Sequence, residues 1–211
     1  MKRALMPIVV GAALLTSVTA NAAHVVVTST PATNPYSGPT PTYDFESPVP
    51  IVGGSVVNNE VAGQHIRPFG STGNYYAVGP FDGTPAELAL GPISKISFLW
   101  GSIDAFNVFE LLDAANQVLF SINGVTIKND MDPQPGNVNR VVTFTITDGA
   151  TQSAISKARF SSRLNAFEID NIAIQAVPEP GTWLMMILGM LGVGFAMRRR
   201  PAEPAMRIRF S

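Results

Sequence analysis

The sequence predicts an all-β fold for its central part, residues 23–177, in the form of a β-sandwich or jelly roll. Many short segments alternate apolar and polar residues with the period of two that half-buried strands show. Residues typical of turns separate these segments, and no stretch between them carries a sustained helical period. No repeat of fixed length is visible, which counts against a solenoid or a propeller. Two antiparallel sheets around one core are the architecture that this pattern favours.

The individual strands follow from the same alternation. Residues 28–50 are rich in Pro, Thr and Ser, and we expect an extended leader there. One edge strand is expected within it, because Tyr43 and Phe45 alternate with acidic residues. Asn123-Gly124 is a strong signal for a hairpin turn. In chain order the expected strands are His24–Thr28, Thr42–Glu46, Val49–Val57, Tyr75–Val78, Glu87–Leu90, Ile96–Trp100, Asn107–Asp113, Val118–Ile122, Val141–Thr147, Ser156–Ser161 and Ala166–Gln175.

Residues 1–22 have the three features of a secretory signal peptide. Lys2 and Arg3 give a positive start, and an apolar stretch follows over residues 4–18. The stretch ends at the small residues Ala20-Asn21-Ala22, so we expect signal peptidase to cleave between Ala22 and Ala23. A retained membrane anchor is the alternative, but the apolar stretch is short and stops at the cleavage site.

Residues 182–197 contain no charge and predict one transmembrane helix near the end of the chain. A helix of this length spans about 24 Å, slightly less than the ~30 Å of a hydrocarbon core. Trp183 at one end suits a membrane interface, and Arg198, Arg199 and Arg200 at the other end suit cytoplasmic headgroups. Residues 201–211 would then be a cytoplasmic tail. A core helix is the alternative, but it would be amphipathic, and this segment has no polar face.

The segment just before this helix carries a more specific pattern, Pro178-Glu179-Pro180-Gly181-Thr182-Trp183. The two prolines keep the backbone extended and remove two amide donors, as suits a processing site. The segment resembles the PEP-CTERM sorting signal, in its variant with Trp three residues after the second Pro. The resemblance rests on the order of its features: the Pro-Glu-Pro triplet, the Trp, the Gly-rich apolar helix and the Arg cluster. The resemblance covers residues 177 to about 200 and departs from the family in the extra tail at residues 201–211.

This resemblance implies that the protein is a substrate of an exosortase in a Gram-negative bacterium. Its implied course is a precursor anchored in the inner membrane, cleavage near Pro178-Glu179-Pro180, and transfer to the cell surface or extracellular matrix. The three motif residues would be a substrate site, because the exosortase reaction needs a cysteine and this chain has none.

A second resemblance covers roughly residues 43–174. Residues 75–80, 96–104 and 165–172 are similar to the ectodomain that recurs among exosortase-sorted proteins. The likeness implies a jelly-roll-like sandwich with an extracellular role. It implies no binding residues, because that class of ectodomain has no established chemistry.

Two acidic groups are candidates for a metal site. Glu168 and Asp170 lie two residues apart on an expected strand, so they share a face and could ligate Ca²⁺ or act as acid and base. Asp130 and Asp132 lie in an expected loop, where oxygen ligands suit Ca²⁺, although the spacing is not that of an EF-hand. The alternative in both cases is solvated surface charge that satisfies turn amides. Apart from possible Ca²⁺, no cofactor is expected.

Aromatic rings are the candidates for glycan contact, since rings stack on the apolar faces of sugars. Tyr75, Tyr76 and Phe81 are the candidate platform, whereas Trp100 lies in the most apolar strand and is expected in the core. A hydrolase is the least favoured class. A Ser-His-Asp site would have to use His65, and neither a Gly-x-Ser-x-Gly elbow nor a nucleotide-binding loop is present.

Charge narrows the function further. The whole chain has a net charge of −1, but residues 23–177 hold 7 Lys and Arg against 13 Asp and Glu. The exported part is therefore acidic, which argues against nucleic acid as a partner. The expected function is that of a non-enzymatic, exported surface or matrix protein that binds an exopolysaccharide or envelope glycan. The alternatives are a structural matrix component without a specific ligand and a polysaccharide hydrolase.

Overall fold

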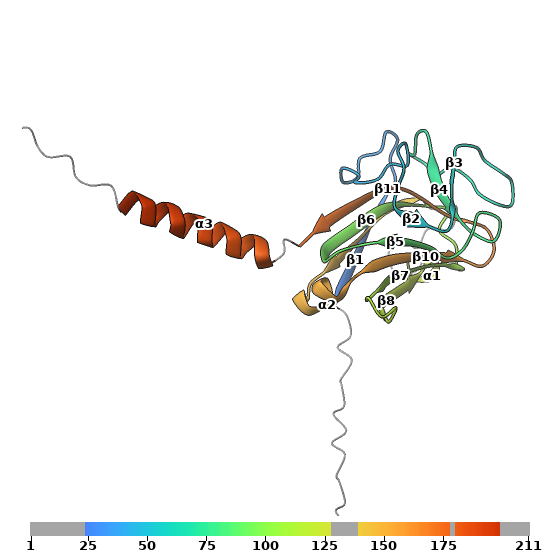
Figure 1. The fold of residues 1–211 in the computed structure, drawn as a ribbon. Coiled ribbons are helices and arrows are strands. Elements are labelled where there is room, and N and C mark those ends of the chain that lie inside the picture. Colours follow the sequence, from blue (N-terminus) through green and yellow to red (C-terminus); the bar gives the residue numbers. More distant parts are fainter. Residues whose placement is uncertain (1–23, 128–138, 178–179, 199–211) are drawn as a thin grey trace, which may run out of the picture.

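The structure is a computed structural model, and it describes residues 24–127, 139–177 and 180–198. These residues are mostly β, and the chain runs through them with short helices between some of the strands (Figure 1). In chain order the elements are β1 (Val25–Pro31), β2 (Ile51–Val52), β3 (Ser55–Val57), β4 (Tyr75–Val78), β5 (Ala86–Ala89), β6 (Ile93–Gly101), β7 (Asn107–Leu112), β8 (Val118–Asn123), α1 (Gly124–Thr126), β9 (Arg140–Ile146), α2 (Gly149–Ala154), β10 (Lys157–Ser162), β11 (Phe167–Ala176) and α3 (Pro180–Arg198).

The strands form two antiparallel sheets, as the alternation of the sequence predicts. The six-stranded sheet has the order β1-β9-β6-β11-β4-β3, and the five-stranded sheet has the order β2-β5-β10-β7-β8. β11 lies inside the larger sheet, where it pairs with β6 on one side and β4 on the other. The two sheets share one hydrophobic core, an arrangement consistent with the predicted β-sandwich.

The core between the sheets is largely aromatic. Phe98 of β6 contacts Phe109 and Phe160 of the opposite sheet, with ring centroids 5.1 Å and 5.3 Å apart. Trp100 stacks on Phe167 at 4.3 Å and is fully buried, which confirms its expected place in the core. Ring contacts at these separations stabilise a core beyond the area that they bury.

The expected edge strand at residues 42–46 is wrong. Tyr43 forms only an isolated bridge with Ile172. The bridge does not extend into a strand, because Phe45 has a positive φ of 62°. This backbone turns the Phe45 side chain inward, where it is 2% exposed and stacks on Tyr76. Tertiary burial of one aromatic side chain therefore overrides the local alternation.

Two short helices begin at residue types that are also typical of turns. Asn123 caps α1 through a hydrogen bond from the Thr126 amide to its side chain, so the expected hairpin turn at Asn123-Gly124 is wrong. Asp148 caps α2 in the same way, accepting from the Thr151 amide at 2.8 Å. Asn and Asp favour N-cap positions as strongly as turns, so the same residues suit either structure.

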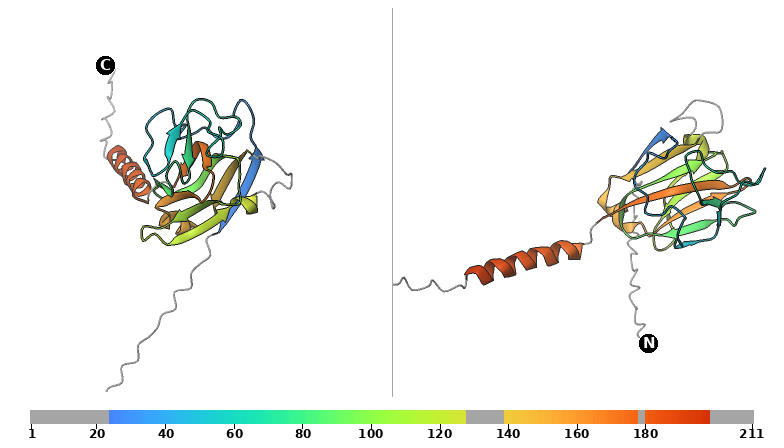
Figure 2. Two further views of the ribbon diagram at one scale, coloured as in Figure 1. Left: turned by 90° about the vertical axis from the view of Figure 1, so that its right-hand side faces the viewer. Right: turned by 90° about the horizontal axis from the view of Figure 1, so that it is seen from above.

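The outer face of the six-stranded sheet is covered by the segment between β1 and β4, which we call the loop layer (residues 32–74). The views in Figures 1 and 2 show these blue to teal loops against β11 and β4. Tyr43 and Thr42 donate backbone hydrogen bonds to Ile172 of β11, and Ala166 donates to Gln64. The central strands are thus covered on both faces, by the core on one side and by the loop layer on the other.

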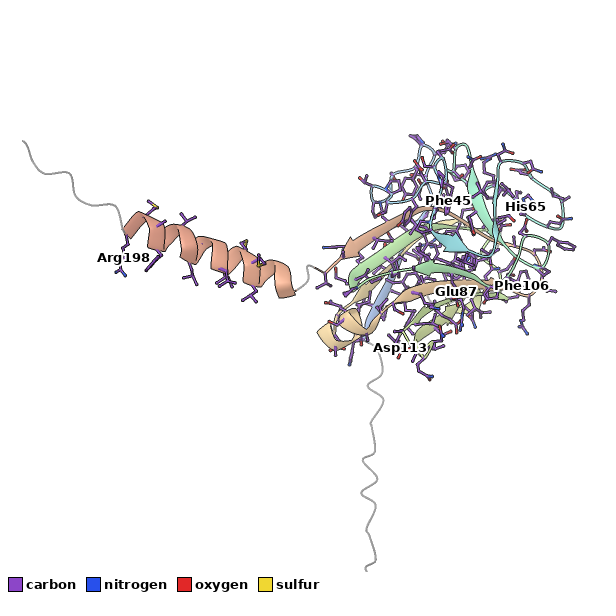
Figure 3. All side chains as sticks on the ribbon, viewed as in Figure 1. Phe45, His65, Glu87, Phe106, Asp113 and Arg198 are labelled. Atoms are coloured by element: carbon purple, nitrogen blue, oxygen red, sulfur yellow. The ribbon has the colours of Figure 1, made fainter. Side chains whose placement is uncertain are left out.

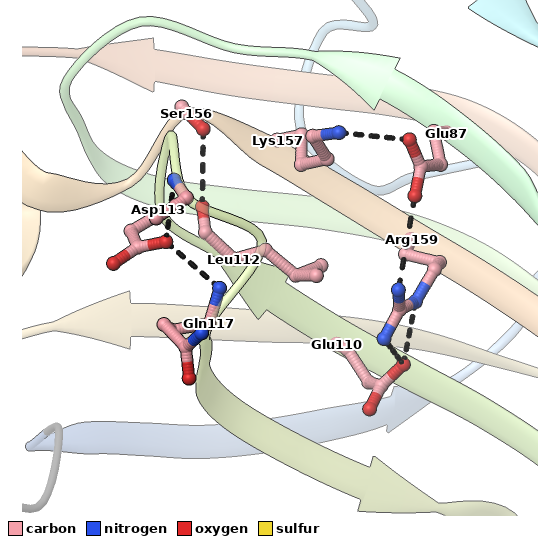
Figure 4. Close-up of polar contacts among 9 residues, drawn as sticks. Glu87, Glu110, Leu112, Asp113, Gln117, Ser156, Lys157 and Arg159 are labelled. Atoms are coloured by element: carbon pink, nitrogen blue, oxygen red, sulfur yellow. Dashed lines mark hydrogen bonds and ion pairs between the residues drawn. The ribbon is translucent and has the colours of Figure 1, made fainter.

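The outer face of the five-stranded sheet carries a ladder of ion pairs (Figure 4). Arg159 of β10 lies directly opposite Glu87 of β5 and Glu110 of β7. Its guanidinium contacts Glu110 at 2.8 Å, and Lys157 contacts Glu87 at 2.9 Å. Opposite charges on facing strands of a partly exposed sheet contribute modestly to stability and fix the strand register.

The aromatic core predicts the effect of a single truncation. Replacing Phe98 with Ala removes a fully buried ring that contacts both sheets, and should lower the free energy of unfolding by about 3–5 kcal/mol. Urea unfolding followed by circular dichroism measures the change. Phe81→Ala is the matched control, because Phe81 is 68% exposed and its loss should change stability little. Equal effects of the two substitutions would contradict the assignment of the core.

Candidate functional site

A cavity of about 440 Å³ opens where the loop layer meets the beginning of β11. Its walls come from the loop at residues 60–66, from the residues that follow β6, and from the turn before β11. The volume lies in the range of small-molecule sites. The polar side chains that line it are Glu60, Gln64, Ser102, Asp104, Asn165 and Glu168.

Gly101 lies next to Ser102, a cavity-lining residue with a strained backbone. A Cβ on Gly101 would lie 2.7 Å from Pro68 and 3.1 Å from the Cβ of Glu168, so only glycine lets the loop pack this closely on the sheet. Ser102 follows with a positive φ of 41° and lines the cavity. Such a backbone is costly for a residue other than glycine, and residues of this kind cluster at functional sites.

Glu168 is the buried acid of the site. Its neighbours Phe167 and Ile169 point into the core, so its side chain faces the loop layer, where it is 2% exposed. Oε1 accepts a hydrogen bond from the Ile66 amide at 3.1 Å, and Oε2 has no hydrogen-bond partner among the described residues. Burial raises the pKa of Glu168 to about 8, the Ile66 amide opposes this rise, and Asp104 and Asp82 add to it. At neutral pH the group is therefore mostly a neutral carboxylic acid.

His65 lies in the loop layer (Figure 3) and lines the same cavity as Glu168, and two partners fix its ring. The Tyr75 hydroxyl donates its one hydrogen to the Asn59 carbonyl at 2.6 Å, so it accepts from His65 Nδ1 at 2.9 Å. His65 Nε2 lies 3.7 Å from Oδ1 of Asp82. The ring partners are thus a tyrosine and an aspartate rather than the serine that a hydrolytic triad would need.

Asp170 lies on the same face of β11 as Glu168, as their spacing predicts, but the two side chains have different surroundings. Asp170 accepts from the Asn171 amide at 2.7 Å. Burial raises the pKa of Asp170 to about 6, and Asp44 and Glu46 contribute to the rise. Both acids are 2% exposed, which corrects the alternative that they are solvated surface charge.

The geometry around Glu168 and Asp170 does not support the predicted calcium site. Within the part of the chain that the structure describes, no three His, Cys, Asp or Glu side chains are arranged to hold a metal ion. Asp130 and Asp132 lie outside the described residues, so calcium binding in that loop stays a prediction.

Two of the three aromatic residues expected to contact a glycan are buried, so the prediction is wrong for them. Tyr75 is 0% and Tyr76 is 5% exposed, because Tyr75 lies beneath the loop layer and Tyr76 faces the core. Neither ring can stack on a sugar at the surface. Phe81 is exposed, and so is Phe69, which the sequence analysis did not single out. The sequence holds no signal for this difference, because it depends on loops that fold back from other parts of the chain.

The residues of the predicted targeting signals lie partly outside the description. The described residues do not include Ala20, Ala22, Ala23, Pro178, Glu179, Arg199 and Arg200. Helix α3 begins at Pro180, includes Trp183 and ends at Arg198. No helix in the described ranges combines the length and the apolar character that a membrane crossing requires, so a transmembrane helix at 182–197 is not confirmed.

The residue before the Pro178-Glu179-Pro180 triplet, Val177, is held by the folded domain. The Val177 amide donates to the Pro92 carbonyl at 2.9 Å, one residue beyond the end of β11. Only residues 178–179 separate this contact from the start of α3. The predicted processing site therefore adjoins the folded domain without a linker.

The burial of Glu168 predicts how stability depends on pH. The folded state binds the Glu168 proton more tightly than the unfolded state, so stability is highest below about pH 4.5 and falls as the pH rises to about 8. Between pH 6 and 9 wild-type protein should lose a few kcal/mol of unfolding free energy, since one pKa unit corresponds to about 1.4 kcal/mol. Urea unfolding at a series of pH values measures this slope.

Glu168→Gln should flatten this slope, because the amide is neutral at every pH in the series. Asp170→Asn is the matched control and should keep the slope above about pH 7, where Asp170, with a pKa of about 6, is largely ionised. The assignment fails if Glu168→Gln loses stability with pH as steeply as wild type.

Comparison with known proteins bears on the C-terminal segment. Residues 176–200 match the family model of the PEP-CTERM protein-sorting motif. No curated protein matches the chain, and no solved structure matches it. The motif implies export, a membrane-anchored precursor, processing by an exosortase and sorting to the cell surface. The chain therefore carries the PEP-CTERM sorting motif in its C-terminal segment.

Proposed function

We propose that this protein is a non-enzymatic surface or matrix component that an exosortase delivers as a folded, jelly-roll-like domain. The observation that carries the proposal is the sorting motif at residues 176–200, which continues directly from the central strand β11. The proposed host is a Gram-negative bacterium, and signal peptidase removes residues 1–22 during export.

The finer course of sorting belongs to the same proposal. The exosortase recognises Pro178-Glu179-Pro180 together with Trp183, the variant with Trp three residues after the second Pro. The segment 182–197 holds the precursor at the inner membrane, with Arg198, Arg199 and Arg200 and the tail 201–211 on the cytoplasmic side. Cleavage near Pro180 then releases a domain in which the Val177 amide is hydrogen-bonded to the Pro92 carbonyl.

Intact-mass analysis of the surface form tests this processing. Wild-type protein should end near Pro180, without Arg198–Arg200. Replacing both Pro178 and Pro180 with Ala should leave the C-terminal segment attached, because the prolines keep the processing site extended. Pro201→Ala is the control and should be processed normally, since it lies beyond the matched residues. Surface protein that still carries the Arg cluster would refute processing and leave a plain membrane anchor.

For the delivered domain we propose glycan binding, as an adhesion module in the envelope or biofilm matrix. Two observations support it: a cavity of sugar-sized volume with several polar side chains, and the exposed rings of Phe81 and Phe69. The second candidate is a structural matrix component without a ligand. A hydrolase remains the least favoured, because His65 is engaged by Tyr75 and Asp82.

A glycan array tests the adhesion proposal. The mature protein should bind at least one exopolysaccharide of its host, and Phe81→Ala should weaken binding by about tenfold through loss of ring stacking. Val118→Ala is the control, because Val118 is also exposed but lies in β8 of the five-stranded sheet, outside the proposed contact. Repeating the array with a chelator tests the calcium prediction. Absence of binding to every host polysaccharide would favour the structural component.

A further inference from the structure

The cavity beside β11 has an unusual balance of charge. Two of its lining side chains, Glu60 and Glu168, are carboxylic acids, and a third acid, Asp104, has an interaction of its own within the chain. A fourth, Asp82, lies close enough to act on Glu168 and to contact His65. The nearby cation, Arg67, is directed elsewhere: its guanidinium donates to the carbonyls of Gly73 and Asn58 and lies over the Tyr75 ring. The cavity therefore favours a ligand that is positively charged.

The buried carboxyl of Glu168 is the second, independent sign of a ligand. One of its oxygens is satisfied by the Ile66 amide, while the other has no partner among the described residues although the side chain is 98% buried. A buried polar atom without a partner is costly in a folded protein and calls for an explanation. A hydrogen-bond donor in the cavity would supply the missing partner.

We propose that this cavity binds the primary ammonium group of an organic ligand, and that in a glycan this ligand is a 2-amino sugar with a free amino group. The inference rests on the proposed glycan-binding function and specifies the class of sugar.

An ammonium group fits the cavity better than a metal ion does. Calcium requires six to eight oxygen ligands at close range, and no suitable cluster exists among the described residues. An ammonium group needs only three acceptors at ordinary hydrogen-bond distance. The volume of about 440 Å³ is also far larger than one ion requires and accommodates a sugar ring.

The remaining lining residues suit the rest of such a ring. The side chains of Gln64, Ser102 and Asn165 can donate to and accept from sugar hydroxyls. Val61 and Ile66 provide apolar wall for the ring face. An acetylated amino group would lose both the charge and two of its donors, so the free amine should be strongly preferred.

Binding should also release a proton. In the empty site burial keeps Glu168 protonated below about pH 8, and the acids Asp104 and Asp82 oppose its ionisation. An ammonium group beside the carboxyl stabilises the ionised form, so the Glu168 proton passes to the buffer while the ligand keeps its own protons. The other groups around the acid are His65, Tyr75 and Glu60, and Tyr75 keeps its proton because burial raises its pKa to about 12.

Isothermal titration of the mature protein with glucosamine, N-acetylglucosamine and glucose tests the inference. At pH 6 the amine is charged and Glu168 is protonated. Glucosamine should bind at least about tenfold more tightly than the two neutral sugars. The heat of binding should vary with the ionisation enthalpy of the buffer, in the sense of proton release.

Two variants make the test specific. Glu168→Gln should abolish proton release and weaken glucosamine binding, with circular dichroism to check that it folds. Asp170→Asn, a buried acid on the same strand with other neighbours, should change neither. Equal or tighter binding of the neutral sugars, or unchanged proton release in Glu168→Gln, would overturn the inference but leave glycan binding intact. Absence of binding to all three sugars would overturn it as well, and the glycan array would then decide the fate of the wider proposal.

Discussion

The double burial of β11 is the constraint on which the other features depend. Core side chains cover one face of this strand and the loop layer covers the other, so alternate residues that would normally meet water do not. Glu168 and Asp170 are consequently buried acids with raised pKa values. Tyr75 on the neighbouring strand is buried for the same reason. The cavity exists because the loop layer meets the sheet incompletely at the beginning of β11.

This arrangement separates the sorting motif from the proposed ligand cavity in space. Residues 176–200, which match the sorting motif, continue from the C-terminal end of β11. The cavity lies near the beginning of the same strand, at Glu168. Processing at one end of β11 therefore leaves the acids, the loop layer and the exposed Phe81 untouched. A ligand site placed this way can be complete before sorting begins.

The sheets could be predicted from the sequence, while the site could be predicted only in part. Alternation places β6, β9 and β11 correctly, because each strand carries its own signal over several residues. It fails at Phe45, where a positive φ and burial in the core override the local pattern. The spacing of Glu168 and Asp170 predicts that they share a face. The partner of Glu168 is the Ile66 amide, 102 residues earlier in the chain, and no local pattern reveals such a contact.

The direct passage from β11 into the sorting segment has a mechanical consequence. A domain attached to the cell through its C-terminus is pulled along β11, which is hydrogen-bonded to β6 and β4 on its two sides. Bonds of an antiparallel ladder run perpendicular to the strands, so this force loads them together in shear instead of peeling them one by one. The edge strand β1, paired only with β9, bears none of that load directly. The attachment point is therefore well placed to withstand drag at a surface.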